Sequence, residues 1–277
     1  MADAYIVVLD VAESAIRALL FDSEAMRVEG YSAQLPRRAD AAADCLDEMH
    51  RLVRAAGFRV AAVVGRAESE VTAEDRKVWP AFEGVAWFPA LPEGASVVLG
   101  IGCVSSEQCA LVVGETSMLG TVIERPIDTE GLTCVAIDEK RWLLAGAVPE
   151  AGLAYGSLKK AIKGSVEKYL ADAAEGDPLL APMDVAARKF REIYEKLAGH
   201  GAAPQVIGLV KSANLAQRFA EALGAPVTVS TEPEPAGRGA ALWALERVGA
   251  IDHLRARPAS MGAVFEASPT GKLEATP

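Results

Sequence analysis

The sequence contains few of the residues that build metal sites and covalent frameworks. Only three of its 277 residues are histidine, and their wide separation in the chain, at His50, His200 and His253, disfavours a metal site or a catalytic triad. Four cysteines, Cys45, Cys103, Cys109 and Cys134, lack the CxxC spacing of zinc and redox sites. We interpret these cysteines as buried thiols.

Positive charge and long apolar runs are also lacking. Against 38 Asp and Glu there are 28 Lys and Arg, a net charge of −10, which has the wrong sign for binding nucleic acid or an anionic membrane. No stretch approaches the roughly 18 apolar residues of a membrane-spanning helix. Asp3 and Asp10 flank the first apolar run, which disfavours a signal sequence. We therefore expect a cytoplasmic protein with no nucleic-acid or membrane partner.

Apolar residues nevertheless make up 51% of the chain, although only 6% are aromatic. This composition predicts a folded protein, and the length allows one large domain or two lobes. Apolar patterning predicts strands at 5–10, 15–22, 27–34 and 59–64, with a helix at 39–56. A polar stretch at 65–84 is interpreted as the connection to a second lobe.

The remainder of the chain repeats this order of elements. We expect strands at 108–113, 117–123, 132–137, 142–147, 205–209 and 226–230 and helices at about 150–171, 183–198, 212–223 and 235–248. A polar break is expected at 172–182, and a tail is expected from about Arg255 that is poorly ordered at its end. Several strands followed by alternating strands and helices, in each half, suggest a duplicated α/β fold with a cleft between the lobes.

Four segments carry a resemblance to a known family. Residues 9–22, LDVAESAIRALLFD, resemble the opening β-hairpin of the actin-like sugar kinases. Residues 87–120 resemble the FGGY carbohydrate kinases, especially the gluconokinase branch, and residues 137–152 and 215–251 are similar to later parts of the same family. The resemblance implies an actin-like, ribonuclease-H-like α/β fold with mixed sheets and flanking helices. It implies a shortened N-terminal lobe at 1–84, a C-terminal lobe at 85–255 and a tail at 256–277.

The resemblance also implies two catalytic carboxylates. Asp10 matches the aspartate that the family associates with Mg²⁺, and Glu93 stands at the position of the general-base aspartate. Glutamate keeps a base of similar pKa but moves its oxygen by about 1 Å, a misplacement that can lower a rate by about 10²-fold. The alternative interpretation of Glu93 is a solvated side chain in a Pro-Gly turn.

The two phosphate-binding turns that the resemblance implies are altered. Ala12-Glu13-Ser14 replaces Gly-Thr-Ser in the first, and the second keeps Gly114 but has Glu115 before Thr116. Loss of the first glycine hinders close approach of backbone to phosphate. The two added carboxylates would repel ATP unless a cation intervenes.

The parts that would bind adenosine and sugar are altered as well. Ile207-Gly208-Leu209 replaces the family's Gly-Gly-Gly turn, so Gly208 and Leu209 mark the adenosine position. The family's Trp-Asp-x-Arg and Gly-Glu-Arg motifs have no counterpart. Trp79 and Trp87 could line the remainder of a sugar site, but packing is the interpretation we favour for both.

Two functions follow from these matches and substitutions. The first is a gluconokinase-like carbohydrate kinase that uses ATP and Mg²⁺ to phosphorylate a sugar acid, sugar or polyol, with activity weakened or lost. The second is a non-catalytic pseudokinase that serves as a binding module or as a homo-oligomeric assembly module. Four altered parts of one machine favour the second over efficient turnover.

Overall fold

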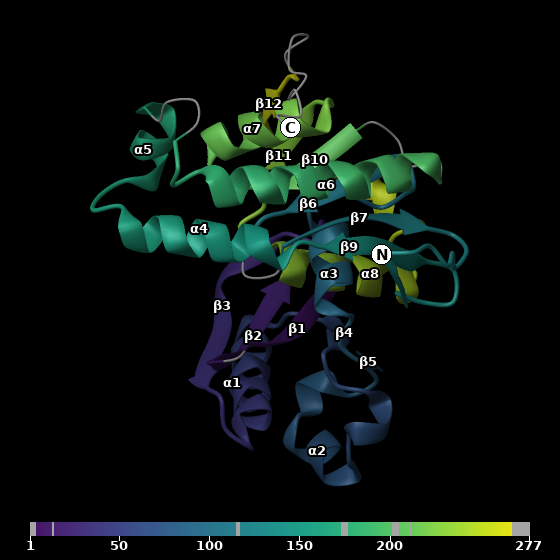
Figure 1. Ribbon diagram of the computed structural model, residues 1–277. Coiled ribbons are helices and arrows are strands. Elements are labelled where there is room, and N and C mark those ends of the chain that lie inside the picture. The colour runs from purple at the N-terminus through teal and green to yellow at the C-terminus, as the bar shows by residue number, and fades with distance from the viewer. Residues whose placement is uncertain are drawn as a thin grey trace. The chain divides into compact units, whose positions relative to one another are not determined.

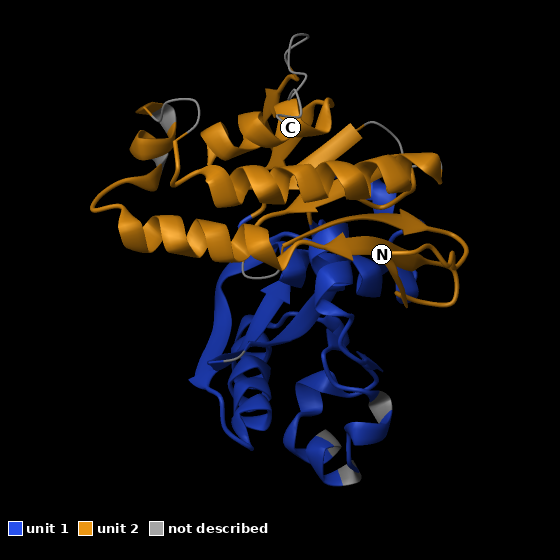
Figure 2. Ribbon diagram, in the orientation of Figure 1, with its two compact units in different colours: residues 1–100, 233–258 blue, residues 101–232, 259–277 orange. Residues whose placement is uncertain are grey.

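The structure is a computed structural model that describes residues 4–12, 14–114, 117–172, 177–200, 205–210 and 212–267 (Figure 1). The chain forms two compact units (Figure 2). Unit 1 comprises Met1–Gly100 and Pro233–Pro258, and unit 2 comprises Ile101–Glu232 and Ala259–Pro277. Among the described residues, no helix has the length and apolar character needed to cross a membrane.

A mixed five-stranded sheet of order β3-β2-β1-β4-β5 forms the centre of unit 1. Its strands are β1 (Tyr5–Val11), β2 (Ala15–Phe21), β3 (Arg27–Pro36), β4 (Val60–Val64) and β5 (Ala86–Phe88). The first three strands are antiparallel neighbours, whereas β4 runs parallel to β1 and β5 runs parallel to β4. The predicted strands of this region are all present.

Helix α1 (Ala41–Ala56) covers part of this sheet because its apolar residues recur at helical spacing. Cys45, Leu46, Met49 and Val53 are fully buried. The helix ends at Gly57, whose φ of 71° provides the left-handed C-cap. The polar stretch after β4 folds within unit 1 as the short helices η1 (Glu68–Glu70), α2 (Ala73–Val78) and η2 (Pro80–Phe82).

Helices α3 (Glu93–Gly100) and α8 (Pro235–Arg247) pack against each other in unit 1, although residues 101–234 lie between them in the sequence. A Cβ atom at Gly239 would lie 1.8 Å from the Ser96 carbonyl oxygen, and one at Gly100 would lie 1.7 Å from that of Pro235. Two glycines therefore permit the close approach of these helices. The remaining helix of this unit is η3 (Leu254–Ala256).

Aromatic residues close the core of unit 1 beside α1. Trp79 and Trp87 are 2% and 5% exposed and stack with ring centroids 6.0 Å apart. Phe82 packs edge-on against Trp87. The packing interpretation of the two tryptophans is confirmed by their burial.

Unit 2 contains a mixed seven-stranded sheet of order β12-β11-β10-β6-β7-β9-β8. The strands are β6 (Gln108–Val112), β7 (Met118–Ile123), β8 (Thr133–Ala136), β9 (Trp142–Ala147), β10 (Gln205–Leu209), β11 (Val227–Ser230) and β12 (Met261–Phe265). Strands β6, β10 and β11 are parallel to one another, and the other pairs are antiparallel.

The helices of unit 2 are α4 (Pro149–Ala161), α5 (Val166–Asp172), α6 (Ala181–Gly199) and α7 (Ala213–Leu223). Phe190 of α6 and Phe219 of α7 meet edge to face in the core, with ring centroids 5.3 Å apart. The single helix predicted at about 150–171 is wrong. Ile162 ends α4 in extended backbone, and Gly164 adopts φ 139°, which is incompatible with a continuous helix.

The apolar patterning predicts no strand in the tail from about Arg255, and here the structure differs. Residues Met261–Phe265 form β12, which pairs with β11 and extends the sheet. The compact units also differ from the predicted lobes, 1–84 and 85–255, because unit 1 extends to Gly100 and also includes Pro233–Pro258. Packing of α8 on α3 and on β1 explains this return of the chain to unit 1.

Candidate functional site

The two predicted catalytic carboxylates both lie near or after the carboxyl ends of strands in the unit 1 sheet. Asp10 is near the carboxyl end of β1, and Glu93 begins α3, which follows the carboxyl end of β5. Strand β4 lies between β1 and β5, so the carboxyl ends of β1 and β5 are two strand spacings apart, about 10 Å. Ligands of open α/β sheets bind at the carboxyl ends of parallel strands. The carboxyl ends of β1, β4 and β5 are therefore the candidate site of unit 1.

Asp10 is paired with Arg17, the residue directly opposite it on β2. Arg17 Nε donates to Asp10 Oδ2 at 3.0 Å, and its Nη2 donates to the same oxygen. The other side of the guanidinium donates to both oxygens of Glu234, at 3.0 and 3.1 Å. Arg27 Nη1 also donates to Glu234, at 3.2 Å. Two arginines and two carboxylates thus form one charge-balanced network.

The network is half-buried and holds both arginines in fixed positions. The side chains of Asp10, Arg17 and Glu234 are 27%, 30% and 18% exposed. Partial burial alone would lower the pKa of Arg17, but hydrogen bonds and charges from Asp10 and Glu234 outweigh it and raise that pKa. The guanidinium therefore keeps its charge and shares it between two carboxylates.

Glu93 differs from Asp10 because nothing described in the structure holds its carboxylate. The residue is exposed at the first turn of α3, where its carbonyl oxygen accepts a 2.9 Å hydrogen bond from Ser96 Oγ. A carboxylate at a helix N-terminus interacts favourably with the helix dipole. Glu93 is accessible as a base, but no described partner orients it.

The first predicted phosphate turn closes the β1–β2 hairpin. The Ala12 amide donates to the Ala15 carbonyl at 2.9 Å, and both Ala12 and Ser14 are exposed. Glu13 lies outside the described residues. Neither Ala12 nor Ser14 is among the described residues with positive φ, so neither adopts the backbone conformation that favours glycine.

The second predicted phosphate turn lies at the carboxyl end of β6 in unit 2. The Gly114 amide donates to Ser117 Oγ at 3.2 Å, and that hydroxyl donates to the Gly114 carbonyl at 2.8 Å. A Cβ atom at Gly114 would meet nothing within 4 Å, and its φ is not in the left-handed region. Neither packing nor backbone conformation therefore requires glycine here, which leaves room for a ligand to approach the backbone. Glu115 and Thr116 lie outside the described residues.

Gly208 and Leu209, predicted on the adenosine side, belong to strand β10 and not to a turn. The Leu209 carbonyl accepts a 3.1 Å bond from the Val113 amide, which places it beside the end of β6. A Cβ atom at Gly208 would approach Val227 Cγ1 to 2.9 Å. Packing against β11 therefore accounts for this glycine. After the strand, the Ser212 hydroxyl caps α7 by accepting a hydrogen bond from the Leu215 amide.

The described residues do not fit Mg²⁺ with ATP well. Mg²⁺ binds through one or two carboxylates together with substrate phosphates, and Asp10, the matching carboxylate, is already paired with Arg17. Within the described parts of the chain, no group of three or more His, Cys, Asp or Glu is arranged to hold a metal ion. Phosphate groups bind to Lys, Arg and helix N-termini, but Arg17 and Arg27 are bound to carboxylates.

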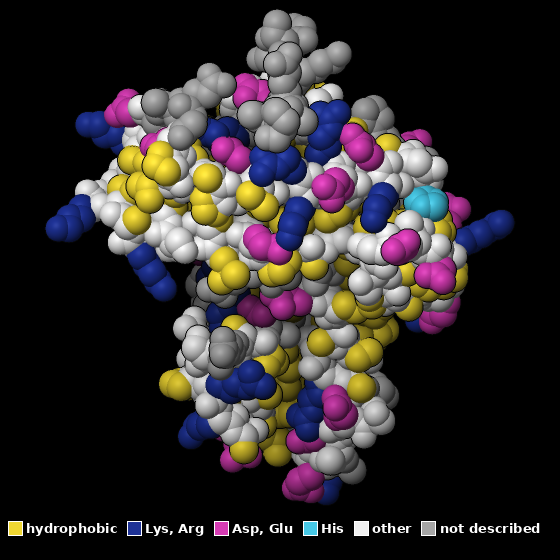
Figure 3. All heavy atoms as spheres, in the orientation of Figure 1, with side chains coloured by type: hydrophobic (Ala, Val, Ile, Leu, Met, Phe, Trp, Pro, Cys, Tyr) yellow, Lys and Arg dark blue, Asp and Glu magenta, His cyan; other side chains and the backbone are white. Residues whose placement is uncertain are grey.

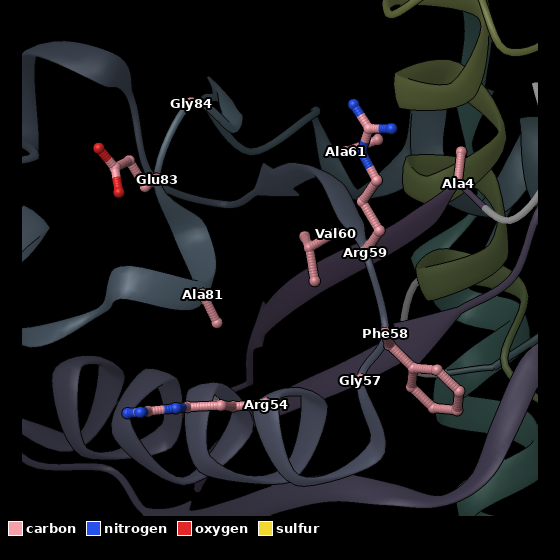
Figure 4. Close-up of a pocket in the computed structure, with 10 residues that line it drawn as sticks. All are labelled: Ala4, Arg54, Gly57, Phe58, Arg59, Val60, Ala61, Ala81, Glu83 and Gly84. Atoms are coloured by element: carbon pink, nitrogen blue, oxygen red, sulfur yellow. The ribbon is translucent and has the colours of Figure 1, made fainter.

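A cavity of about 630 Å³ lies in unit 1 beside the start of β4, at the opposite end of this strand from the candidate site. It is lined by Ala4, Arg54, Gly57, Phe58, Arg59, Val60, Ala61, Ala81, Glu83 and Gly84. Figure 4 shows that Arg54, Arg59 and Glu83 extend in different directions and do not converge on one point. This cavity is therefore separate from the candidate site and lacks a focused set of polar groups.

The surface drawn in Figure 3 carries both signs of charge. Lys and Arg side chains alternate with Asp and Glu on this face, and the coloured side chains do not merge into a continuous basic patch. The distribution agrees with the net charge of −10.

Sequence reasoning missed Arg17, Arg27 and Glu234 as site residues. Arg17 had a detectable signal, because the predicted hairpin of residues 9–22 can pair position 10 with position 17, as β1 and β2 do. Glu234 had none, since 217 positions separate it from Arg17 and only the packing of α8 in unit 1 joins them.

Comparison with solved structures identifies the class of fold as that of the actin-like ATPases. The similar structures are carbohydrate kinases of the FGGY family, in agreement with the expectation from the sequence. Gluconate kinase from Lactobacillus acidophilus aligns with a TM-score of 0.70 and 12% identity over 96% of this chain and 94% of that chain. Xylulose kinase from Rhodospirillum rubrum gives 0.75 and 11% over the same shares of the two chains.

A glycerol kinase from Plasmodium falciparum, solved with ADP, aligns with a TM-score of 0.62 and 10% identity over 97% of this chain and 95% of that chain. The sequence itself matches no protein-family model and no curated protein. The predicted actin-like α/β fold with mixed sheets is confirmed by these structural likenesses.

Proposed function

We propose that this chain is a homologue of the carbohydrate kinases in which phosphotransfer from Mg²⁺–ATP to a sugar, sugar acid or polyol is weakened or lost. The observation that carries the proposal is the network in unit 1 in which Arg17 binds Asp10 and Glu234 together. It is supported by Glu93, a longer side chain than aspartate, which stands exposed at the same sheet edge without a described partner.

The physical argument concerns charge. Phosphoryl transfer depends on positive charge that neutralises the phosphates and on a base positioned at the attacking hydroxyl. In unit 1 the positive charges of Arg17 and Arg27 are already balanced by Asp10 and Glu234. Glu13 and Glu115 add negative charge to both turns that would receive phosphate. These changes act on different steps, so their effects should multiply.

The direct test is a coupled assay of ADP release with gluconate, xylulose and glycerol as acceptors. We expect acceptor-dependent ADP release to be absent or close to the rate without protein. Fast acceptor-dependent turnover that disappears in Glu93→Ala, with the fold of that variant intact by circular dichroism, would overturn the proposal.

A repair variant tests whether the substitutions themselves weaken the site. Glu13→Thr, Glu93→Asp and Glu115→Thr combined should restore Mg²⁺–ATP binding, seen as a rise in melting temperature with added nucleotide. The matched control, Glu29→Thr with Glu124→Thr, removes two negative charges from exposed positions, one in each unit. It should show no such rise. An equal response of both variants would contradict the argument from local charge.

A non-catalytic assembly role is the second candidate. The observation that favours it is the uncharged free edge of the unit 2 sheet, formed by β12.

A further inference from the structure

Strand β12 is an open edge of the unit 2 sheet. It pairs with β11 on one side and has no strand on the other side within the described part of the chain (Figure 1). Backbone N–H and C=O groups of alternate residues therefore point outward without a strand partner. Met261 and Val264 are 42% and 53% exposed, and Gly262 and Ala263 are exposed as well.

The composition of β12 lacks the devices that usually protect a free edge. Its five residues, MGAVF, include neither a charge nor a proline. The free edge strand of unit 1 differs, because β3 carries Arg27, Glu29, a glycine at φ 80° and Pro36. At the opposite edge of the unit 2 sheet, β8 is only four residues long. The edge at β12 is thus the longer unprotected edge of this sheet.

We propose that β12 pairs with β12 of a second copy of this chain, antiparallel and about a two-fold axis. The alternation of outward and inward backbone groups allows only registers centred on a residue. The register centred on Ala263 pairs all five residues of the strand. This inference does not depend on the loss of phosphotransfer.

The side chains are complementary in that register. Met261 would face Phe265 of the second copy, and Gly262 would face its Val264, so each larger side chain meets a smaller or a flexible one. Ala263 would face Ala263 of the second copy. The next pair outward joins Ser260 with Glu266, so no like charges face each other. One isologous contact of this kind closes at a dimer.

The assembly is tested first by the mass of the full chain in analytical ultracentrifugation over a range of micromolar concentrations. A monomer–dimer equilibrium is expected. Val264→Lys should weaken the dimer about tenfold or more, because the substitution acts twice in a symmetric contact. The matched control Val135→Lys, at an exposed valine on β8, should leave the equilibrium unchanged. A monomer at every concentration, or equal effects of both substitutions, would overturn the proposal.

The register is tested by cross-linking. Opposite Cβ atoms in antiparallel strands lie about 5 Å apart, so Ala263→Cys should give a disulfide-linked dimer under mild oxidation. Ala136→Cys, an exposed residue on β8, should not. A shortened chain that ends at Ala267 tests the alternative that residues 268–277 of the same chain occupy this edge. If the full chain is monomeric and the shortened chain dimerises, residues 268–277 cover β12 and the proposal is wrong.

Discussion

At the scale of single residues, Arg17 decides much of the chemistry at the candidate site. Its guanidinium joins Asp10 on the first strand to Glu234, 217 positions away in the chain. The same side chain therefore joins two distant parts of unit 1 and engages Asp10, for which the sequence predicts a role at Mg²⁺.

Arg17→Met should lower the free energy of unfolding by about 1 kcal/mol, because the pair is only partly buried and solvent screens it. Urea unfolding measures the change, and added salt should reduce it. Arg38→Met is the matched control, since Arg38 pairs with Asp44 but is 62% exposed. An equal loss in both variants would contradict a special role for the Arg17 network.

His50 predicts a pH dependence of stability. Its Nε2 atom is buried without a described partner, and its ring packs edge-on against Phe82. Burial, reinforced by Arg54 and opposed by Asp47, lowers the pKa of His50 below its ordinary value. The unfolded chain then binds this proton more readily than the folded one, so stability falls as pH falls from about 6.5 toward the folded pKa.

Melting temperatures between pH 7.5 and pH 5 should therefore decline less steeply in His50→Gln than in the parent protein, beginning at about pH 6.5. His253→Gln, which alters an exposed histidine, should leave the slope unchanged. Identical slopes in the parent and both variants would show that His50 does not titrate in this way.

The candidate site could be predicted from the sequence only in part. The resemblance predicts Asp10 and Glu93 as site residues, and the structure has Asp10 near the carboxyl end of β1 and Glu93 at the start of α3, which follows β5. Their roles stay predictions. The resemblance matches Gly208 to a Gly-Gly-Gly turn, whereas the residue lies in β10, where packing against Val227 accounts for the glycine. The partners of Asp10 depend on tertiary packing, which no local pattern reveals.

At the scale of secondary-structure elements, the crossing of α3 and α8 holds two distant parts of unit 1 together. Gly239→Ala would place a methyl group 1.8 Å from a backbone carbonyl oxygen, and backbone cannot yield as a flexible side chain can. We expect a loss of about 2 kcal/mol or more. Gly156→Ala in α4, where a Cβ would meet nothing within 4 Å, should instead stabilise by up to about 1 kcal/mol.

Chemical denaturation of both glycine variants measures this difference. A Gly239→Ala protein as stable as the parent would show that α3 and α8 are not packed as closely as described.

Most long elements could be predicted because their apolar periodicity is strong, as in β1, β2 and α1. The elements missed are short or lack periodicity. Strand β5 has three residues, and β12 resembles a loop in composition until its pairing with β11 is known. The break between α4 and α5 depends on the conformation of Gly164, which apolar spacing does not report.

At the scale of the whole molecule, the fold is that of the carbohydrate kinases to which the chain is similar. The cores of both units are built from ordinary apolar packing, which the substitutions at the candidate site leave intact. We therefore expect the stability of each unit to be independent of phosphotransfer.

Calorimetric titration of the full chain with Mg²⁺–ATP, paired with melting curves at millimolar nucleotide, tests the central claim most directly. We expect no saturable heat and no rise in melting temperature. Arg17 and Arg27 are already paired with carboxylates. The charges of Glu13 and Glu115 should in addition repel phosphate. Saturable binding at micromolar nucleotide, with a matching rise in melting temperature, would contradict it.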